Sequence, residues 1–372
     1  MLLTFLVVIH ELGHAIAARR NGVVVQEFGI GFPPKFAGYQ LKNGILLSIN
    51  ALPLGGFVKL QGENDAASNP GDYGATSLWS KTKILLAGVT MNWLFAILAL
   101  TLLALIGFPK VLPNQFTVPS DTREVTTPLK VTFISSGSPA QKIGLKVNDK
   151  IISVAGKKIT TAQDLVAATS ANQGKKIEVI YTRDGQTFQV YAQLRYNPDK
   201  SKGVLGVATS TQTLRYSTWS APIVGLGTTV QFSTATLKGL GDLVSQLYNG
   251  LTSQLSDDKA AREKGNQDLS AAGNSVGGPL SIVGVFFPAA QNAGASTLLF
   301  LTAIISLTLA VMNILPIPAL DGGRLFLAYL FRIIRKPLTK DVEDSIVGYS
   351  FLALMVLVVV ITVADVFKIQ SL

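Results

Sequence analysis

Four long apolar stretches limit the folds open to this chain more than any other feature. Only 15% of its 372 residues are charged, against about 25% in soluble domains, and the mean hydropathy is +0.40. A helix of roughly 20 residues crosses the apolar core of a bilayer, so each stretch is a candidate span. The sequence therefore predicts a multi-pass α-helical membrane protein with about four transmembrane helices. The stretches are Leu2–Ala18, Ile84–Phe108, Thr297–Pro316 and Ile346–Val363.

The first stretch, Leu2–Ala18, is short for a membrane span. A secretory signal peptide is the alternative, but Ala17-Ala18-Arg19-Arg20 stands where a small-residue cleavage site would be needed. We therefore expect a span; a start placed a few residues late would explain its short length, and the sequence leaves this open.

Lysine and arginine residues gather in two connections between these stretches. Because cytoplasmic loops carry an excess of such residues, we expect both connections in the cytoplasm and the long middle region outside. The net charge of +10 would by itself fit nucleic acid or anionic lipid. Orientation accounts for part of it, and we predict a lipid bilayer as partner and no nucleic acid. One group is Arg19, Arg20, Lys35, Lys42, Lys59, Lys81 and Lys83; the other is Arg324, Arg332, Arg335, Lys336 and Lys340.

The regions between the spans differ in pattern. Asn43-Gly44 between two apolar runs signals a hairpin, which suggests a membrane-associated β sheet at the cytoplasmic face. Residues 117–206 alternate strand and helix patterns, typical of one small α+β domain. The predicted parts are 1–20 (first span), 21–62 (β segment), 63–83 (cytoplasmic loop), 84–108 (second span), 117–206 (α+β domain), 220–255 (amphipathic helix), 256–275 (flexible loop), 297–324 (third span) and 345–368 (fourth span).

Both histidines of the chain lie in the run His10-Glu11-Leu12-Gly13-His14, inside the first apolar stretch. Positions four apart share a helix face, so the two imidazoles can bind one metal ion. Glu11 adjoins that face and is placed to take a proton from a water on the metal. A carboxylate in a span costs about 2.5–3.5 kcal/mol, so a functional role explains Glu11 better than chance does.

A catalytic zinc usually has three protein ligands and one open position. The chain has no cysteine and no third histidine, so the third ligand has to be a carboxylate. Asp321 is the best candidate, because two prolines and a glycine pair around it break the third span, and broken helices at membrane depth line sites. The alternative is that Asp321 is only a helix N-cap or a turn residue beside Gly322-Gly323. Asn313 could contact substrate or hydrogen-bond between helices, and Asn92 fits a structural bond between spans.

These motifs resemble those of the site-2 protease family, and the resemblance covers nearly the whole chain. His-Glu-Leu-Gly-His at 10–14 is similar to the zinc motif of the family. Asn313, Pro316, Pro318 and Asp321-Gly322 are similar to its second signature.

Three further segments extend this resemblance. Residues 28–33 and 52–57 resemble the membrane-associated β segment of the family, and residues 87–92 resemble its second-span motif, with Thr90 where proline is common. Residues 117–206 resemble one extracytoplasmic PDZ domain, whereas some bacterial members have two. The 256–274 region resembles an insertion. The expected fold is therefore a multi-pass helical membrane protein with a β segment and one PDZ-like α+β domain.

The resemblance implies that His10, His14 and Asp321 bind Zn²⁺ and that Glu11 is the general base. We assign substrate contacts to Asn313, Pro316, Gly55 and Gly56. The implied reaction is the second cut of regulated intramembrane proteolysis, in a single-span membrane protein that an upstream site-1 protease has trimmed. An anti-sigma factor and a remnant signal peptide are both possible substrates.

The implied location is the bacterial inner membrane, with the active site toward the cytoplasm. The PDZ-like domain could bind a carboxyl terminus or exclude untrimmed substrates, and we favour the second role. Two other classes of protein remain open. One is a catalytically silent scaffold, which would not need Glu11. The other is a metal transporter or sensor, for which the paired repeats of transporters are not evident.

Overall fold

The computed structural model describes residues 2–196, 203–211, 213–275 and 278–370. The chain divides into two compact units, Gly107–Thr218 and the remainder, residues 1–106 with 219–372. The larger unit contains the helices around the HELGH motif. Each unit is described by itself below.

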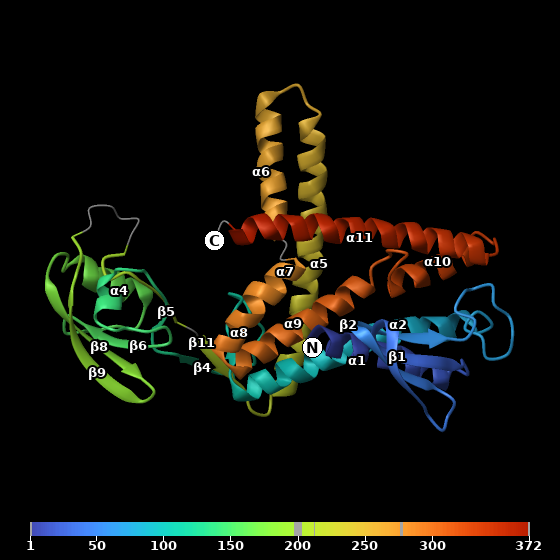
Figure 1. Ribbon diagram of the computed structural model, residues 1–372, viewed down its shortest axis with the longest axis horizontal. Coiled ribbons are helices and arrows are strands. Elements are labelled where there is room, and N and C mark those ends of the chain that lie inside the picture. The colour runs from blue at the N-terminus through green and yellow to red at the C-terminus, as the bar shows by residue number, and fades with distance from the viewer. Residues whose placement is uncertain (1, 197–202, 212, 276–277, 371–372) are drawn as a thin grey trace. The chain divides into compact units, whose positions relative to one another are not determined.

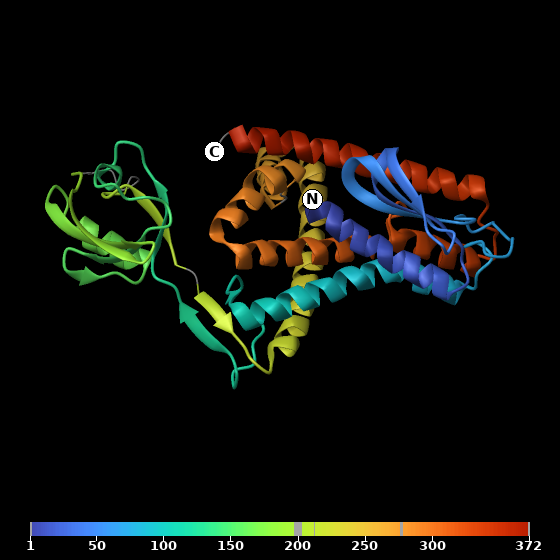
Figure 2. The same ribbon diagram turned by 60° about the horizontal axis from the view of Figure 1, so that its bottom comes forward.

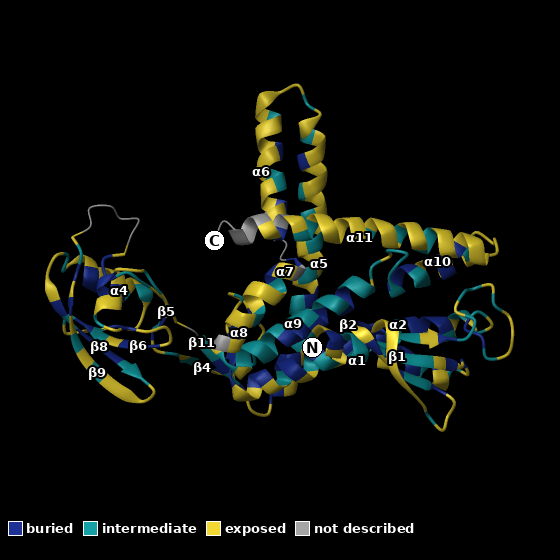
Figure 3. Ribbon diagram, viewed as in Figure 1, coloured by how far each residue is buried: buried dark blue, intermediate teal, exposed yellow. Residues whose placement is uncertain are grey.

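Among the described residues of the larger unit, four helices are long and apolar enough to cross a membrane. Helix α2 (Leu78–Ile106) packs against α1 (Leu2–Arg20) and α9 (Ala295–Asn313). The fourth, α11 (Lys340–Gln370), buries none of the residues in its apolar window, and Figure 3 shows it exposed along most of its length. An apolar surface of this kind is suited to lipid. The buried residues of these helices therefore lie mainly where α1, α2 and α9 meet.

Helix α2 begins six residues before the predicted start at 84. The Ser77 hydroxyl accepts a hydrogen bond from the Ser80 N–H at 3.2 Å, in the manner of a helix cap. Lys81 in the first turn is buried and paired with Asp65. The prediction of a loop over 63–83 was therefore wrong for residues 78–83, because a polar first turn carries no hydropathy signal.

The β segment consists of two long antiparallel strands, β1 (Val25–Gln40) and β2 (Leu46–Leu60), with several register shifts. The predicted turn is present: Gly44 has φ +84°, and the Leu41 N–H donates to the Ile45 carbonyl at 2.8 Å. The sheet lies along α1, on the side away from α2 (Figure 2). Helix α1 thus has a sheet on one flank and a helix on the other.

Helix α5 (Ala221–Gln254) packs its first half on α2, where Gly225 leaves room for Thr101 and the Ile97 carbonyl. Its second half forms a hairpin with α6 (Lys259–Ser275), which projects away from the other helices (Figure 1). The prediction of a flexible loop over 256–275 was therefore wrong for residues 259–275. Residues 259–275 have no apolar period, but contact at Gly250 and Gly265 brings the two helices close together.

The predicted third span, 297–324, is two helices. Helix α9 ends at Asn313, and α10 begins at Asp321 and runs to Ile333. Before α9 the chain forms one broken helical stretch: α7 (Pro279–Ser281), the π-helical turn η1 (Ile282–Phe286) and α8 (Phe287–Ala293).

The smaller unit, residues 107–218, is an α+β structure. Its larger sheet has the strand order β10-β5-β6-β8-β9, with β7 paired to β6, and covers an apolar core that includes Leu129, Ile151 and Val179. A second sheet has the order β3-β11-β4. The elements are β3 (Phe108–Pro109), β4 (Arg123–Thr126), β5 (Lys130–Ile134), α3 (Pro139–Lys142), β6 (Lys150–Val154), β7 (Lys157–Lys158), α4 (Ala162–Ser170), β8 (Lys176–Arg183), β9 (Gln186–Gln193), β10 (Val207–Ser210) and β11 (Thr213–Tyr216).

Candidate active site

The two histidines of α1 lie on one buried face of the helix, each only 7% exposed. Their Nε2 atoms are 3.1 Å apart, and the ring planes are almost perpendicular. The four-residue spacing produces this arrangement, because residues i and i+4 are neighbours on a helix surface.

Asp321 joins the histidines from the first turn of α10. Its Oδ2 lies 2.9 Å from His10 Nε2 and 3.3 Å from His14 Nε2. The turn that delivers it is tight: a side chain at Gly322 or Gly323 would collide with the Ile314 or Ile317 carbonyl. Residues 311 positions apart in the sequence therefore share one site.

The three converging atoms fit a zinc ion. Bonds of about 2.0–2.1 Å in tetrahedral geometry separate ligand atoms by about 3.3 Å, close to the three distances here. Two imidazole nitrogens and one carboxylate oxygen are also a donor set that zinc accepts. The group His10, His14 and Asp321 is the only cluster of this type among the residues that the structure describes.

Helix α2 packs against both imidazoles. His14 Nδ1 lies 2.8 Å from the Ile84 carbonyl, an interaction that orients the ring and leaves Nε2 toward Asp321. A Cβ on Gly88 would lie 2.5 Å from His14 Nε2 and 2.6 Å from His10 Cε1. Only glycine at this position leaves space for both rings. Gly88 lies in the 87–92 motif, but nothing in the sequence alone singles it out as a support of the histidines.

Glu11 lies beside this cluster, and its Oε2 accepts a hydrogen bond from the Val58 N–H of β2 at 3.0 Å. The sheet therefore positions the carboxylate that the sequence nominates as base.

Two small cavities reach the cluster. One of about 290 Å³ is lined by His10, Glu11 and Asp321 and also by Gly56, Asn92 and Asn313. The other, of about 210 Å³, is lined by Glu11, His14 and Asp321 and continues to Glu63, Tyr73 and Arg324. Glu11 thus borders both cavities. The second cavity has more charged residues in its lining than the first.

The structure brings Asn313 and Gly56 to the first cavity but not Pro316 or Gly55. Pro316 is exposed in the turn after α9, where its ring ends the helix. Gly55 has φ +114°, a backbone conformation that favours glycine, and a Cβ there would lie 3.0 Å from the Phe32 ring. The assignment of substrate contacts to Pro316 and Gly55 therefore finds no support in the geometry.

Asn92 joins two spans, as predicted, but its side chain has a further property that the sequence does not reveal. The predicted bond between spans is present through the backbone, because the Asn92 carbonyl accepts a hydrogen bond from the Ser306 hydroxyl of α9 at 3.0 Å. Its side chain, however, is fully buried, and neither amide atom has a partner among the described residues. An unpartnered buried amide is rare and needs an explanation, such as a bound water, an ion or a catalytic role. Asn92 is among the residues around the first cavity, although its side chain is closed off from solvent.

The second cavity leads into a charged network. Burial raises the pKa of the Glu63 carboxyl, and the Arg324 guanidinium opposes that effect. Burial likewise raises the pKa of the Tyr73 hydroxyl. Arg324 donates to the Glu63 carbonyl at 2.6 Å and lies within 3.8 Å of Glu343. This side of the site is polar and suited to water.

Comparison with known proteins identifies the family. The profile of peptidase family M50 matches residues 1–357. A protein from Clostridium acetobutylicum, whose name assigns it to the zinc metalloproteases, is 32% identical over 365 residues, which cover 97% of this chain and 94% of that one. A similarly named protein from Clostridium perfringens is 31% identical and covers 97% of this chain and 95% of its own.

Two further similarities concern regulation and the smaller unit. The regulator of sigma-W protease RasP from Bacillus subtilis is 26% identical over 437 residues, which cover 95% of this chain and 94% of RasP. A solved PDZ domain of an SdrC-like protein from Listeria monocytogenes covers 22% of this chain and 86% of its own, with 19% identity and a TM-score of 0.20. A score that low supports no statement about the fold.

The family profile spans almost the entire chain, and the relatives named above align over nearly their whole length. The resemblance to the site-2 proteases is thereby confirmed, together with the expected zinc dependence. This chain belongs to peptidase family M50 and is a zinc metalloprotease.

Proposed function

We propose that the protein hydrolyses a peptide bond within or near the transmembrane segment of a single-span membrane protein. The observation that carries this proposal is the convergence of His10, His14 and Asp321 beside Glu11, on helices apolar enough to cross a bilayer. Membership of a metallopeptidase family favours an enzyme over a silent scaffold or a metal transporter.

His10, His14 and Asp321 would hold the zinc ion. When bound, zinc supplies a Lewis acid that lowers the pKa of water and stabilises negative charge on a carbonyl oxygen. Glu11 accepts the proton of the attacking water and returns it to the departing amine. The Val58 N–H binds only Oε2, and no described residue bonds Oε1, so that oxygen is free to take the proton.

The two cavities suggest separate routes for substrate and water. An extended substrate would occupy the cavity lined by Gly56, Asn92 and Asn313, where the Asn313 amide can pair with its backbone. Gly56 presents no side chain, and the β1–β2 sheet offers a backbone for strand addition. Water would enter past Glu63 and Arg324. A substrate helix has to unwind here, because its carbonyls are otherwise occupied.

Regulated proteolysis is the best-supported context for this reaction. The similarity to RasP, named as a regulator of sigma-W protease, favours an anti-sigma factor as substrate, with a remnant signal peptide as the second candidate. An upstream site-1 protease would make the first cut. The PDZ-like unit over 117–206 would exclude untrimmed substrates.

The orientation follows from the basic residues. Arg19, Arg20 and Lys83 at one end of α1 and α2 favour the cytoplasm at that end, by the positive-inside rule. The active site then lies toward the cytoplasmic face of the inner membrane, and the unit at 107–218 lies outside.

Replacing Glu11 by Gln tests this function. In proteoliposomes with a tagged, externally truncated single-span protein, we expect the Glu11→Gln variant to retain zinc and lose cleavage. His14→Ala and Asp321→Ala should lose both zinc and cleavage, measured by elemental analysis and by gel mobility of the tag. Persistent cleavage by Glu11→Gln would remove the proposed base.

A further inference from the structure

An apolar groove lies between α1 and α2, outside both catalytic cavities. Its volume is about 460 Å³, within the range of about 300–1,000 Å³ typical of ligand pockets. The helices touch where Gly13 faces the Ala87 carbonyl, and these small residues deepen the groove. Ile16, Leu86 and Met91 are among its apolar lining.

The lining of the groove is suited to an apolar occupant along its length. The Thr82 hydroxyl donates to the Leu78 carbonyl at 2.9 Å, and the Thr90 hydroxyl donates to the Leu86 carbonyl at 2.8 Å. Because both hydroxyls bond to their own helix, they do not need a polar ligand. An acyl chain meets this requirement.

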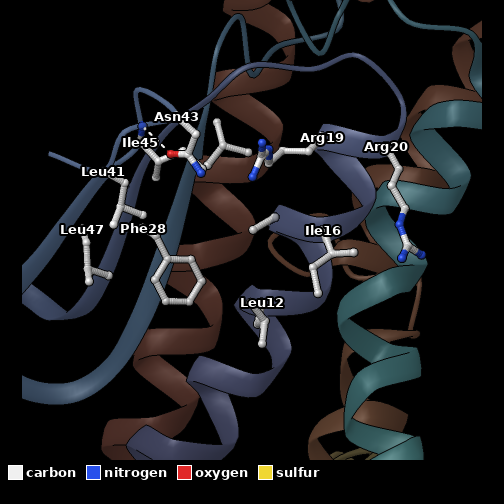
Figure 4. A pocket seen from close by; sticks show the side chains of 11 residues that line it. Leu12, Ile16, Arg19, Arg20, Phe28, Leu41, Asn43, Ile45 and Leu47 are labelled. Atoms are coloured by element: carbon white, nitrogen blue, oxygen red, sulfur yellow. Dashed lines mark hydrogen bonds between the residues drawn. The ribbon is translucent and has the colours of Figure 1, made fainter.

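One end of the groove is cationic. Arg20 closes α1, and Lys83 lies near the start of the antiparallel α2, so both line the same end. Both are exposed, and neither pairs with an acidic residue in the part of the chain that the structure describes. Figure 4 draws a neighbouring pocket, between α1 and the β sheet; in that view Arg20 extends toward α2, whereas Arg19 turns toward the sheet.

Trp79 lies at this same end and is 66% exposed. Tryptophan is enriched at the headgroup level of membranes, where its ring is partly apolar and partly wet. Its position therefore places the two cations at the depth of lipid phosphates.

We propose that this groove binds an anionic phospholipid, with an acyl chain beside Ile16, Leu86 and Met91 and its phosphate between Arg20 and Lys83. Charge complementarity selects the lipid. Two unpaired cations attract a net negative headgroup, whereas a zwitterionic lipid also brings a positive group toward them. None of the residues that line the groove lines either catalytic cavity.

Tryptophan quenching measures this binding directly. Trp93 and Trp219 are replaced by Phe, so that Trp79 is the reporter. The full chain is placed in phosphatidylcholine bilayers that contain a small fraction of either dibrominated phosphatidylglycerol or dibrominated phosphatidylcholine. Each cation near the surface contributes about fivefold to lipid preference, so we expect at least about fivefold stronger apparent binding of the anionic lipid.

Matched variants locate the effect. Arg20→Gln with Lys83→Gln should abolish the preference, and Arg20→Lys with Lys83→Arg should keep it. Arg335→Gln with Lys336→Gln, which removes two exposed charges elsewhere, should leave it unchanged. Equal quenching by the two lipids in the reporter protein would overturn the proposal and leave the groove to a protein segment. A preference that survives loss of Arg20 and Lys83, or that depends on Arg335 and Lys336, would also overturn it.

Discussion

Replacing Gly88 by Ala should disable the zinc site without unfolding the helix that carries it. A Cβ at position 88 would lie 2.5 Å from His14 Nε2 and 2.7 Å from His10 Nε2, against 3.4 Å for ordinary contact. The imidazoles would therefore have to retreat by about 0.9 and 0.7 Å. Metal sites tolerate distance errors of only about 0.2 Å.

The expected losses follow from these displacements. A misplacement of about 1 Å at a reacting centre costs on the order of 10²-fold in rate, and disturbed ligand support costs about 10–100-fold in metal affinity. Alanine is favoured over glycine inside a helix by about 1 kcal/mol, so α2 itself should not melt. The Gly88→Ala variant should thus stay folded, bind zinc weakly and cleave about 10²-fold more slowly.

Competition with a zinc chelator and cleavage of a tagged substrate in proteoliposomes measure the two effects. Gly348→Ala is the matched control, because Gly348 lies in α11 and a Cβ there would meet nothing within 4 Å. That control should keep zinc and activity. Wild-type zinc affinity and cleavage in Gly88→Ala would refute the reasoning that this glycine makes room for the imidazoles.

Three further changes test other parts of the structure. Burial raises the pKa of Glu63, and a carboxyl whose pKa is raised by folding lowers the stability of the protein as pH rises. The Glu63→Gln variant should therefore be more stable than the wild type in thermal unfolding, with a difference that is absent near pH 4 and grows above it. Hydrogen bonds from Thr160 and Thr161 lower the pKa of Asp164 to about 2, so Asp164→Asn should destabilise at neutral pH, with the difference fading as pH falls from about 4 to 2. A constant difference in either titration would contradict these assignments. A Cβ at Gly250 would lie 2.6 Å from Leu269 Cγ, so Gly250→Val should open the α5–α6 hairpin and speed proteolysis of residues 255–259; unchanged cleavage would contradict this packing.

The sequence determined the chemistry of the site because its constraints are local or compositional. Two histidines at helical spacing in an apolar stretch require a reason, and a chain without cysteine offers few third ligands. The apolar stretches likewise located the long helices, since hydropathy reports burial in lipid residue by residue. The Asn43-Gly44 turn was readable for a similar reason, because its backbone geometry is encoded in two residues.

Only the tertiary structure decided which distant residues support that site. Gly88 and Asn92 matter through their distance to the imidazoles and the cavity, which no spacing along α2 reveals. Pro316 and Gly55 share motifs with residues that line the first cavity, yet neither is among its lining residues. Helix α6 depends on contact with α5 at Gly250 and Gly265. Packing between segments far apart in sequence produces these features, and a pattern read along one segment does not record its neighbours.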